Sequence, residues 1–108
     1  MTAGKVTIRA AARRDLVEHY RWLNAEAGND VAERFLLAAD AEFAALASIP
    51  GMGGAVETRH PRLAGIRKWR VGGFANILIF YHERRNGASI VRIIHAAQDW
   101  WALLGVES

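Results

Sequence analysis

The strongest constraint in this chain is an uninterrupted apolar run, Ile77-Leu78-Ile79-Phe80-Tyr81. A strand with apolar side chains on both faces is typical of the centre of a sheet, so other strands must flank it. Asn86-Gly87 follows, which is the strongest short hairpin signal and predicts a type I′ turn. Residues 89–95 then predict the returning strand. The C-terminal half of the chain is therefore expected to form a sheet.

Two further segments have the alternation of strands. Residues 6–9 alternate apolar and polar side chains, which predicts a short strand. Residues 66–71 do the same, with Trp69 on one side and Lys68 on the other. Gly72-Gly73 predicts the turn into the central strand.

Two helices are expected between these strands. The first has apolar side chains three and four residues apart along one face: Ala12, Leu16, Tyr20 and Leu23. It is expected to stop within residues 24–29. Asp30 followed by Glu33 predicts a capping box at the start of the second helix, and Pro50-Gly51 predicts its end. The short link predicts an antiparallel helical hairpin, and residues 51–64 are expected to be irregular.

A short last helix is expected around residues 100–104, with Asp99 as its cap. The order of elements is then β-α-α-β-β-β, followed by the short C-terminal helix. We therefore predict one α+β domain over residues 1–108. Its N-terminal strand lies at an edge, and its helical hairpin packs on one face of a mostly antiparallel sheet.

The formal net charge of +3 conceals a polarised chain. Residues 1–14 carry +4, residues 15–57 carry −6 and residues 58–108 carry +5. On the expected fold, the helical hairpin is acidic and the sheet region is basic. Charge bears on partners rather than on fold, so this division predicts one face for a regulator and another for a target.

Composition excludes several classes of protein. Hydrophobic residues make up 52% and charged residues 23% of the chain, which excludes a disordered protein. The lack of cysteine excludes disulfide scaffolds and thiolate metal sites, and is compatible with the cytoplasmic location that we expect. The histidines lack metal-ligand spacing and no phosphate loop is present, so we expect no metal and no cofactor. No apolar run is long enough to predict a membrane segment.

A cluster of basic residues precedes and occupies the strand at residues 66–71. It provides five fixed positive charges within twelve residues, with no acid among them: Arg59, Arg62, Arg67, Lys68 and Arg70. This pattern favours an anionic target such as nucleic acid, phosphate or an acidic protein surface. An ordinary solvated strand face is the alternative.

A second set of polar side chains lies on neighbouring expected strands: Arg67, Tyr81, Arg92 and His95. A ribonuclease without metal needs a base for the ribose 2′-hydroxyl, an acid for the leaving oxygen and cations for the phosphorane. Tyr81 or His95 can take the proton roles, and the arginines can hold the phosphate. The alternative is structural: Tyr81 lies in the core, His95 binds a nearby backbone group, and Arg92 joins a partly buried ion pair.

Three tryptophans are candidates for a protein interface. Trp100 and Trp101 are adjacent, so a helix cannot bury both on one narrow face, and Trp22 lies at a helix end just off the apolar stripe. Aromatic side chains are enriched at the centres of protein interfaces. We therefore expect these three residues to contact a protein partner.

The ordered set of segments resembles the ParE/RelE superfamily of bacterial toxins, most closely its ParE branch. The resemblance extends from Val6 to about Leu104. The motifs that carry it are Ala11-x-x-Asp15-Leu16, Pro50-Gly51, Arg67-x-Trp69-x-Val71, the apolar strand Ile77–Tyr81, and R-I-I-H-A-A-Q-D at residues 92–99. Many ParE-like chains have arginine at the position of Gln98, so no role of that arginine is implied here.

This resemblance implies the toxin of a bacterial type II toxin–antitoxin (plasmid stabilisation) system, neutralised by a ParD-like antitoxin. It also implies that the toxin inhibits DNA gyrase by binding and catalyses no reaction of its own. The basic cluster then binds the target, and Trp22, Trp100 and Trp101 bind the antitoxin. RelE-like toxins instead cut mRNA on the ribosome, which keeps Arg67, Tyr81, Arg92 and His95 as a catalytic alternative. A third possibility is a non-toxic partner protein of the same fold.

Overall fold

A computed structural model describes residues 4–105 and contains one five-stranded sheet, with the strand order β1-β5-β4-β3-β2. β1 pairs with β5 in parallel at one edge, and all other pairs are antiparallel. The central strand is β4, as the apolar run predicts. The elements are β1 (Lys5–Ile8), α1 (Ala10–Ala27), α2 (Asn29–Ser48), η1 (Pro50–Met52), β2 (Gly54–Ala55), η2 (Pro61–Leu63), β3 (Ile66–Val71), β4 (Phe74–Arg84), β5 (Gly87–His95) and α3 (Trp100–Leu103).

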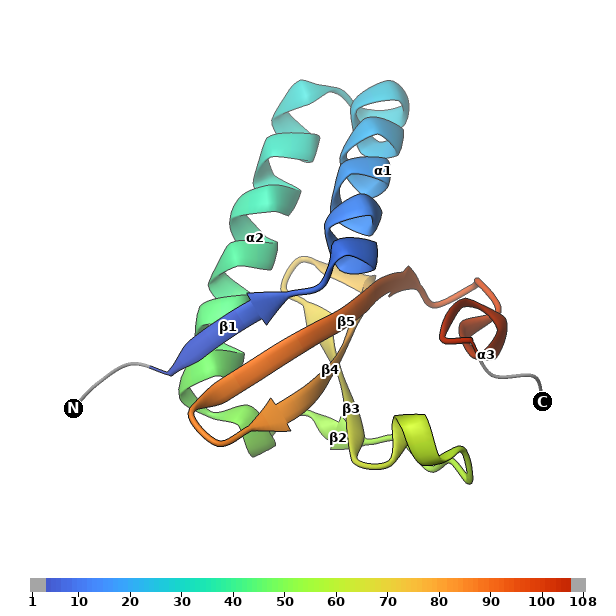
Figure 1. Cartoon of the computed structure of the whole chain (residues 1–108). Helices are drawn as coiled ribbons and strands as arrows, with labels where there is room; N and C mark the ends of the chain where they lie inside the picture. Colours follow the sequence, from blue (N-terminus) through green and yellow to red (C-terminus); the bar gives the residue numbers. More distant parts are fainter. Residues whose placement is uncertain (1–3, 106–108) are drawn as a thin grey trace.

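The hairpin of α1 and α2 covers one side of the sheet, and α3 and η2 lie on the other side (Figure 1). We call these the helix side and the α3 side. Ile79 and Tyr81 of β4 join the main core on the helix side, whereas Phe80 joins a smaller cluster beneath α3. The α+β architecture is thus confirmed. Within residues 4–105, no helix is long and apolar enough to cross a membrane.

A single residue, Gly28, links α1 to α2. Its φ of +96° lies in the left-handed region that glycine adopts without penalty. The predicted capping box of Asp30 and Glu33 is wrong, because α2 begins at Asn29 and has no side-chain cap. The turn at Gly28 starts the helix before Asp30 can serve as its cap. Glu33 instead faces α1, where its Oε1 accepts a hydrogen bond from the Tyr20 hydroxyl at 3.0 Å.

The hairpin of β4 and β5 is present, but the predicted type I′ turn at Asn86-Gly87 is wrong. Arg84 pairs with Gly87, so the turn residues are Arg85 and Asn86. No non-glycine residue within 4–105 has a positive φ, which a type I′ turn requires. Gly87 instead permits a close approach of β1: a Cβ there would lie 1.7 Å from the Lys5 carbonyl oxygen.

The segment expected to be irregular contains a short strand. β2 extends the sheet by two residues, with Gly54 opposite Lys68 of β3. Two residues alone give no alternation in the sequence, so this strand could not be predicted. The end of α2 before Pro50 and the cap of α3 are confirmed, since the Asp99 carboxylate accepts a hydrogen bond from the Ala102 N–H.

Candidate functional site

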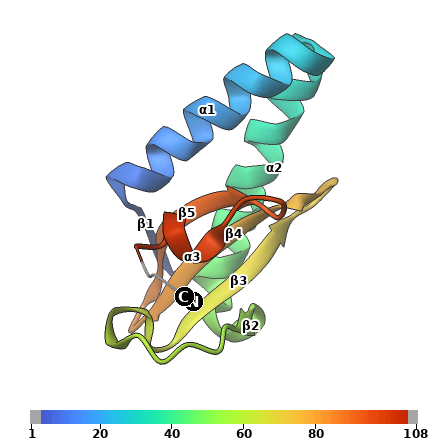
Figure 2. The ribbon, with the colours of Figure 1, turned by 90° about the vertical axis from the view of Figure 1, so that its right-hand side faces the viewer.

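The sheet divides the predicted basic cluster between its two sides. Arg67 alternates with its neighbours along β3 and points to the helix side, where it lies opposite Tyr81. The loop between β2 and β3 runs on the α3 side (Figure 2). Four of the five basic residues therefore lie on the α3 side of β3 or on this bordering loop: Arg59, Arg62, Lys68 and Arg70.

The Arg67 guanidinium is occupied by acceptors of the protein itself. Its Nε donates to Glu83 Oε1 at 2.8 Å. Its Nη1 donates to the carbonyl oxygens of Gly53 at 2.6 Å and Gly51 at 3.3 Å. The ion pair with Glu83 is partly exposed and contributes little on its own. Together these bonds fasten the turn after α2 to β3 and β4.

The Tyr81 hydroxyl is also fully engaged. The residue is 0% exposed, its hydroxyl donates to the Pro50 carbonyl at 2.7 Å, and it accepts from the Gly53 N–H at 2.9 Å. Burial raises the pKa of the phenol, so it stays protonated at neutral pH. A buried phenol with a raised pKa is poorly placed to act as a general base. The geometry agrees with the structural alternative for this residue.

Arg92 belongs to a partly buried ion pair with Asp15 of α1. Its Nε and Nη2 donate to the two carboxylate oxygens of Asp15 at 2.7 and 2.9 Å, which is the strong bidentate arrangement. The remaining Nη1 donates to the Leu103 carbonyl of α3. Hydrogen bonding to Asp15 raises the pKa of Arg92 above its usual value. The guanidinium thus joins α1, β5 and α3.

Two side chains of α1 cap the edge of β5 beyond β1. β1 pairs with β5 only as far as Ile90. Further along, Asp15 Oδ2 accepts from the Ile93 N–H at 2.8 Å, and His19 Nε2 donates to the Ile93 carbonyl at 2.9 Å. The two residues are one helical turn apart, so they share a face. We did not predict this role, although the spacing of four residues beside the apolar stripe was an available signal.

His95 ends β5 and bonds to nearby groups. Its Nδ1 accepts from the Ala97 N–H at 3.1 Å. It pairs with Ile77 of β4, four residues along the strand from Tyr81. Arg92 pairs with Phe80, whose neighbours lie on the α3 side. Arg67 and Tyr81 are thus neighbours, but Arg92 and His95 do not join them around one substrate phosphate.

The three candidate tryptophans differ in exposure. Trp22 on α1 is 60% exposed, whereas Trp100 and Trp101 are both half-buried. The Trp100 ring packs 5.5 Å from the Phe80 ring, and the Lys68 ammonium lies 4.5 Å from its centroid. Trp101 packs against the same apolar cluster. Trp22 therefore offers the most free aromatic surface.

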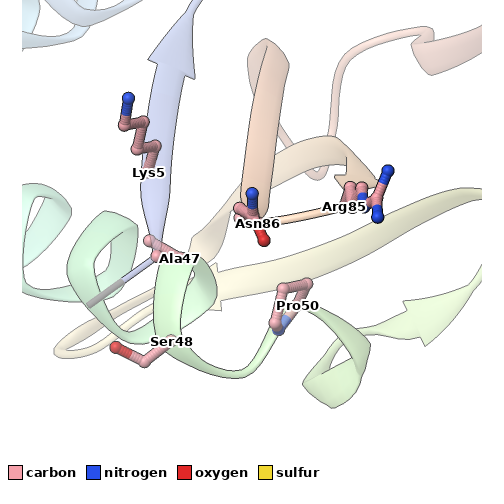
Figure 3. Close-up of a pocket in the computed structure, with 8 residues that line it drawn as sticks. Lys5, Ala47, Ser48, Pro50, Arg85 and Asn86 are labelled. Atoms are coloured by element: carbon pink, nitrogen blue, oxygen red, sulfur yellow. The ribbon is translucent and has the colours of Figure 1, made fainter. Parts of the chain in front are cut away.

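A pocket of about 410 Å³ lies between the end of α2, the start of β1 and the β4–β5 turn (Figure 3). Lys5 and Arg85 stand at its two ends with their side chains directed away from each other, and Asn86 lies between them (Figure 3). None of the described lining residues is a carboxylate or an imidazole. Nowhere within residues 4–105 do three histidine or acidic side chains gather to hold a metal ion.

Comparisons with known proteins identify the family. The family model described as the ParE toxin of the type II toxin–antitoxin system parDE matches residues 6–100. A solved structure titled the chromosomal ParDE TA system from P. aeruginosa has a TM-score of 0.69 and 15% sequence identity. The match covers 86% of this chain and 96% of that chain, and it supports the fold. No curated protein sequence gives a significant match. The family match spans most of the sequence, so this chain belongs to the ParE toxin family of type II toxin–antitoxin systems.

Proposed function

We propose that this toxin arrests DNA gyrase by binding to it, and that a ParD-like antitoxin neutralises the toxin by covering its surface. Family membership supports the class of target and partner. The observation that carries the proposal for a binding mode is the occupation of the candidate catalytic groups. The Tyr81 hydroxyl and the Arg92 guanidinium bind acceptors of the protein itself.

The α3 side is the proposed target surface. It carries positive charge on β3 and on the loop before it, from Arg59, Arg62, Lys68 and Arg70. Arg67 faces the helix side and is bound there, so it does not share this surface. An array of positive charge increases the rate of encounter with an acidic or nucleic-acid partner.

The helical hairpin is the proposed antitoxin surface. An apolar groove of about 540 Å³ lies between α1 and α2, and it is lined by Leu16, Val17, Tyr20 and Leu36. Two arginines complete the lining: Arg13 and Arg21. A helix with an apolar face and flanking acidic residues matches such a groove. Trp22 follows Arg21 on α1 and adds an exposed aromatic side chain.

Parallel assays test the proposed mode of action. Purified toxin is expected to produce stalled gyrase–DNA cleavage complexes and to leave mRNA on translating ribosomes uncut. Tyr81→Phe and His95→Ala variants that remain folded are expected to keep the gyrase activity, because neither side chain lies among the proposed target-binding bases. Cutting of mRNA that is lost in both variants would show that the toxin is a ribonuclease. Absence of growth arrest when the chain is expressed alone would favour a non-toxic partner protein.

Truncation of Trp22 tests the antitoxin surface. Trp22→Ala is expected to weaken the complex with the antitoxin by about 1–3 kcal/mol, because large aromatic side chains dominate interface energies. Isothermal calorimetry measures the dissociation constant. Ile49→Ala is a matched control, since Ile49 is 61% exposed and lies directly after the C-terminal end of α2, away from the α1–α2 link near Trp22. Equal dissociation constants for both variants and the parent protein would remove Trp22 from the interface.

A further inference from the structure

A row of polar residues crosses the α3 side of the sheet near the β4–β5 turn. Strand register aligns Thr7 of β1 with Ser89 of β5, and Ser89 with His82 of β4. Directly paired residues project to the same face of a sheet. His82 also pairs with Ile66, which belongs to the small cluster beneath α3. The row therefore extends from this cluster towards the edge at β1.

His82 is a buried side chain, and its ring nitrogens have no hydrogen-bond partner among the described residues. Only 9% of the residue is exposed. Neither ring nitrogen forms a hydrogen bond within residues 4–105, and yet neither is sealed from solvent, because the same residues contain no fully buried side-chain nitrogen that lacks a partner. The imidazole edge is therefore open to the surface, and no described residue uses its hydrogen-bonding capacity.

Two arginines flank this imidazole. Arg9 Nε donates to Ser89 Oγ at 3.1 Å, which holds the guanidinium beside the row, and its Nη groups have no acceptor among the described residues. Arg84 lies two residues after His82 on the same strand, so it projects from the same face. Its Nη1 donates to the carbonyl of Glu83 at 3.0 Å. Within residues 4–105, no carboxylate is within ion-pair distance of either arginine.

The positive charge at this row is not balanced by any carboxylate among the described residues. Burial lowers the pKa of His82, and the charges of Arg84 and Arg9 lower it further. Among residues 4–105, no carboxylate counters these effects. The imidazole is therefore neutral at pH 7 and stands between two positive charges. An anion at this row would be attracted by both positive charges, and the Ser89 hydroxyl and the imidazole N–H are further donors.

We propose that Arg9, His82, Arg84 and Ser89 form a binding site for a phosphate group. Each of these side chains offers an N–H or O–H donor, and a phosphate offers several acceptor oxygens. Guanidinium groups match phosphate oxygens in a planar, bidentate manner. The site lies apart from Lys68 and Arg70 along the sheet. The proposal depends on the fold and not on the proposed action on gyrase.

The first test is a pH titration of the histidine Cε1–H signals of the full chain by NMR. It is carried out in sodium phosphate and in sodium chloride at equal ionic strength. A neighbouring phosphate favours the imidazolium, so the midpoint of His82 is expected to be about one pH unit higher in phosphate. His19, His60 and His95 serve as internal controls, and His82→Gln assigns the signal. A shift of all four midpoints by the same amount would overturn the proposal.

Charge removal tests the two arginines. Arg9→Gln and Arg84→Gln are each expected to weaken the binding of inorganic phosphate by about tenfold, as expected for the loss of a charge-assisted hydrogen bond. Arg85→Gln is the matched control, because Arg85 is the next residue, is exposed and lies in the turn. It is expected to change the affinity by less than about twofold. An equal loss of phosphate affinity in all three variants would show a general effect of charge and would contradict a specific binding site.

Competition distinguishes the sources of the phosphate group. Decathymidylate is added to the chain in inorganic phosphate, and the His82 signal is followed. If decathymidylate displaces inorganic phosphate and the titration midpoint of His82 stays high, the site binds the backbone phosphate of nucleic acid. Retention of inorganic phosphate supports a site for free phosphate or a monoester. Binding of neither probe at His82 would refute the site.

Discussion

Replacing Asp15 by alanine is expected to lower the free energy of unfolding by about 3 kcal/mol, because it breaks a partly buried ion pair and leaves one charge behind. The Asp15 side chain is 10% exposed and that of Arg92 is 21% exposed. Asp15 also accepts the Ile93 N–H at the open edge of β5. The variant therefore leaves a guanidinium without its counter-ion and a buried backbone N–H without an acceptor. Urea unfolding measures the change.

The Asp15 prediction has a control on the same helix. Glu18→Ala removes an exposed carboxylate one turn along α1, and it is expected to change stability by less than about 0.5 kcal/mol. The Arg92 bond to Leu103 also predicts looser packing of α3 in Asp15→Ala. A shift in Trp100 and Trp101 fluorescence would report this loosening. An Asp15→Ala variant as stable as Glu18→Ala would show that the ion pair does not stabilise the fold.

Replacing Gly87 by alanine is expected to lower the free energy of unfolding by about 3 kcal/mol. The new Cβ would lie 1.7 Å from the Lys5 carbonyl oxygen and 2.6 Å from its carbonyl carbon. These atoms belong to the backbone, so no rotamer change relieves the overlap, and β1 must move away from β5. Hydrogen exchange measures this movement at the amides of Lys5 and Arg9, which donate to the Asn86 and Ile90 carbonyls.

Gly54→Ala is the control for the Gly87 prediction. Gly54 is also a strand residue, but a Cβ there meets no atom within 4 Å and its φ is not positive. This variant is expected to stay within about 0.5 kcal/mol of the parent protein. Gly87→Ala should lose amide protection at β1 and Gly54→Ala should keep it. Intact protection in both variants would mean that the sheet accommodates the methyl group without separating β1.

Local patterns predicted the elements where one rule governed them. The apolar run in β4, the alternation in β3 and the three-and-four spacing in α1 each have a period that side-chain burial imposes. The turns were less predictable. The capping box at Asp30 and the type I′ turn at Asn86-Gly87 were wrong, because α2 already begins after Gly28 and Gly87 lies in β5 against β1. The first failure arose from a neighbouring residue, and only the second involves a segment that is distant in the sequence.

The candidate site shows the same contrast between local sequence signals and contacts made by the fold. The sequence indicated that Arg92 either holds a phosphate or joins an ion pair, and it contained no means of choosing. The ion pair is present in the structure, and its partner Asp15 lies 77 residues away in the chain. Likewise Arg67 and Lys68 are neighbours in the sequence, but the pleat of β3 sends them to opposite sides of the sheet.

The sequence alone determined an α+β domain with a central apolar strand, a helical hairpin and a basic region, because burial periodicity and charge composition are local properties. Only the tertiary structure decided which polar groups are free. The Tyr81 hydroxyl bonds to Pro50 and Gly53, whereas the His82 ring has no hydrogen-bond partner among residues 4–105. Hydrogen bonds and ion pairs act over a few ångströms, so they depend on which distant residues the fold brings together.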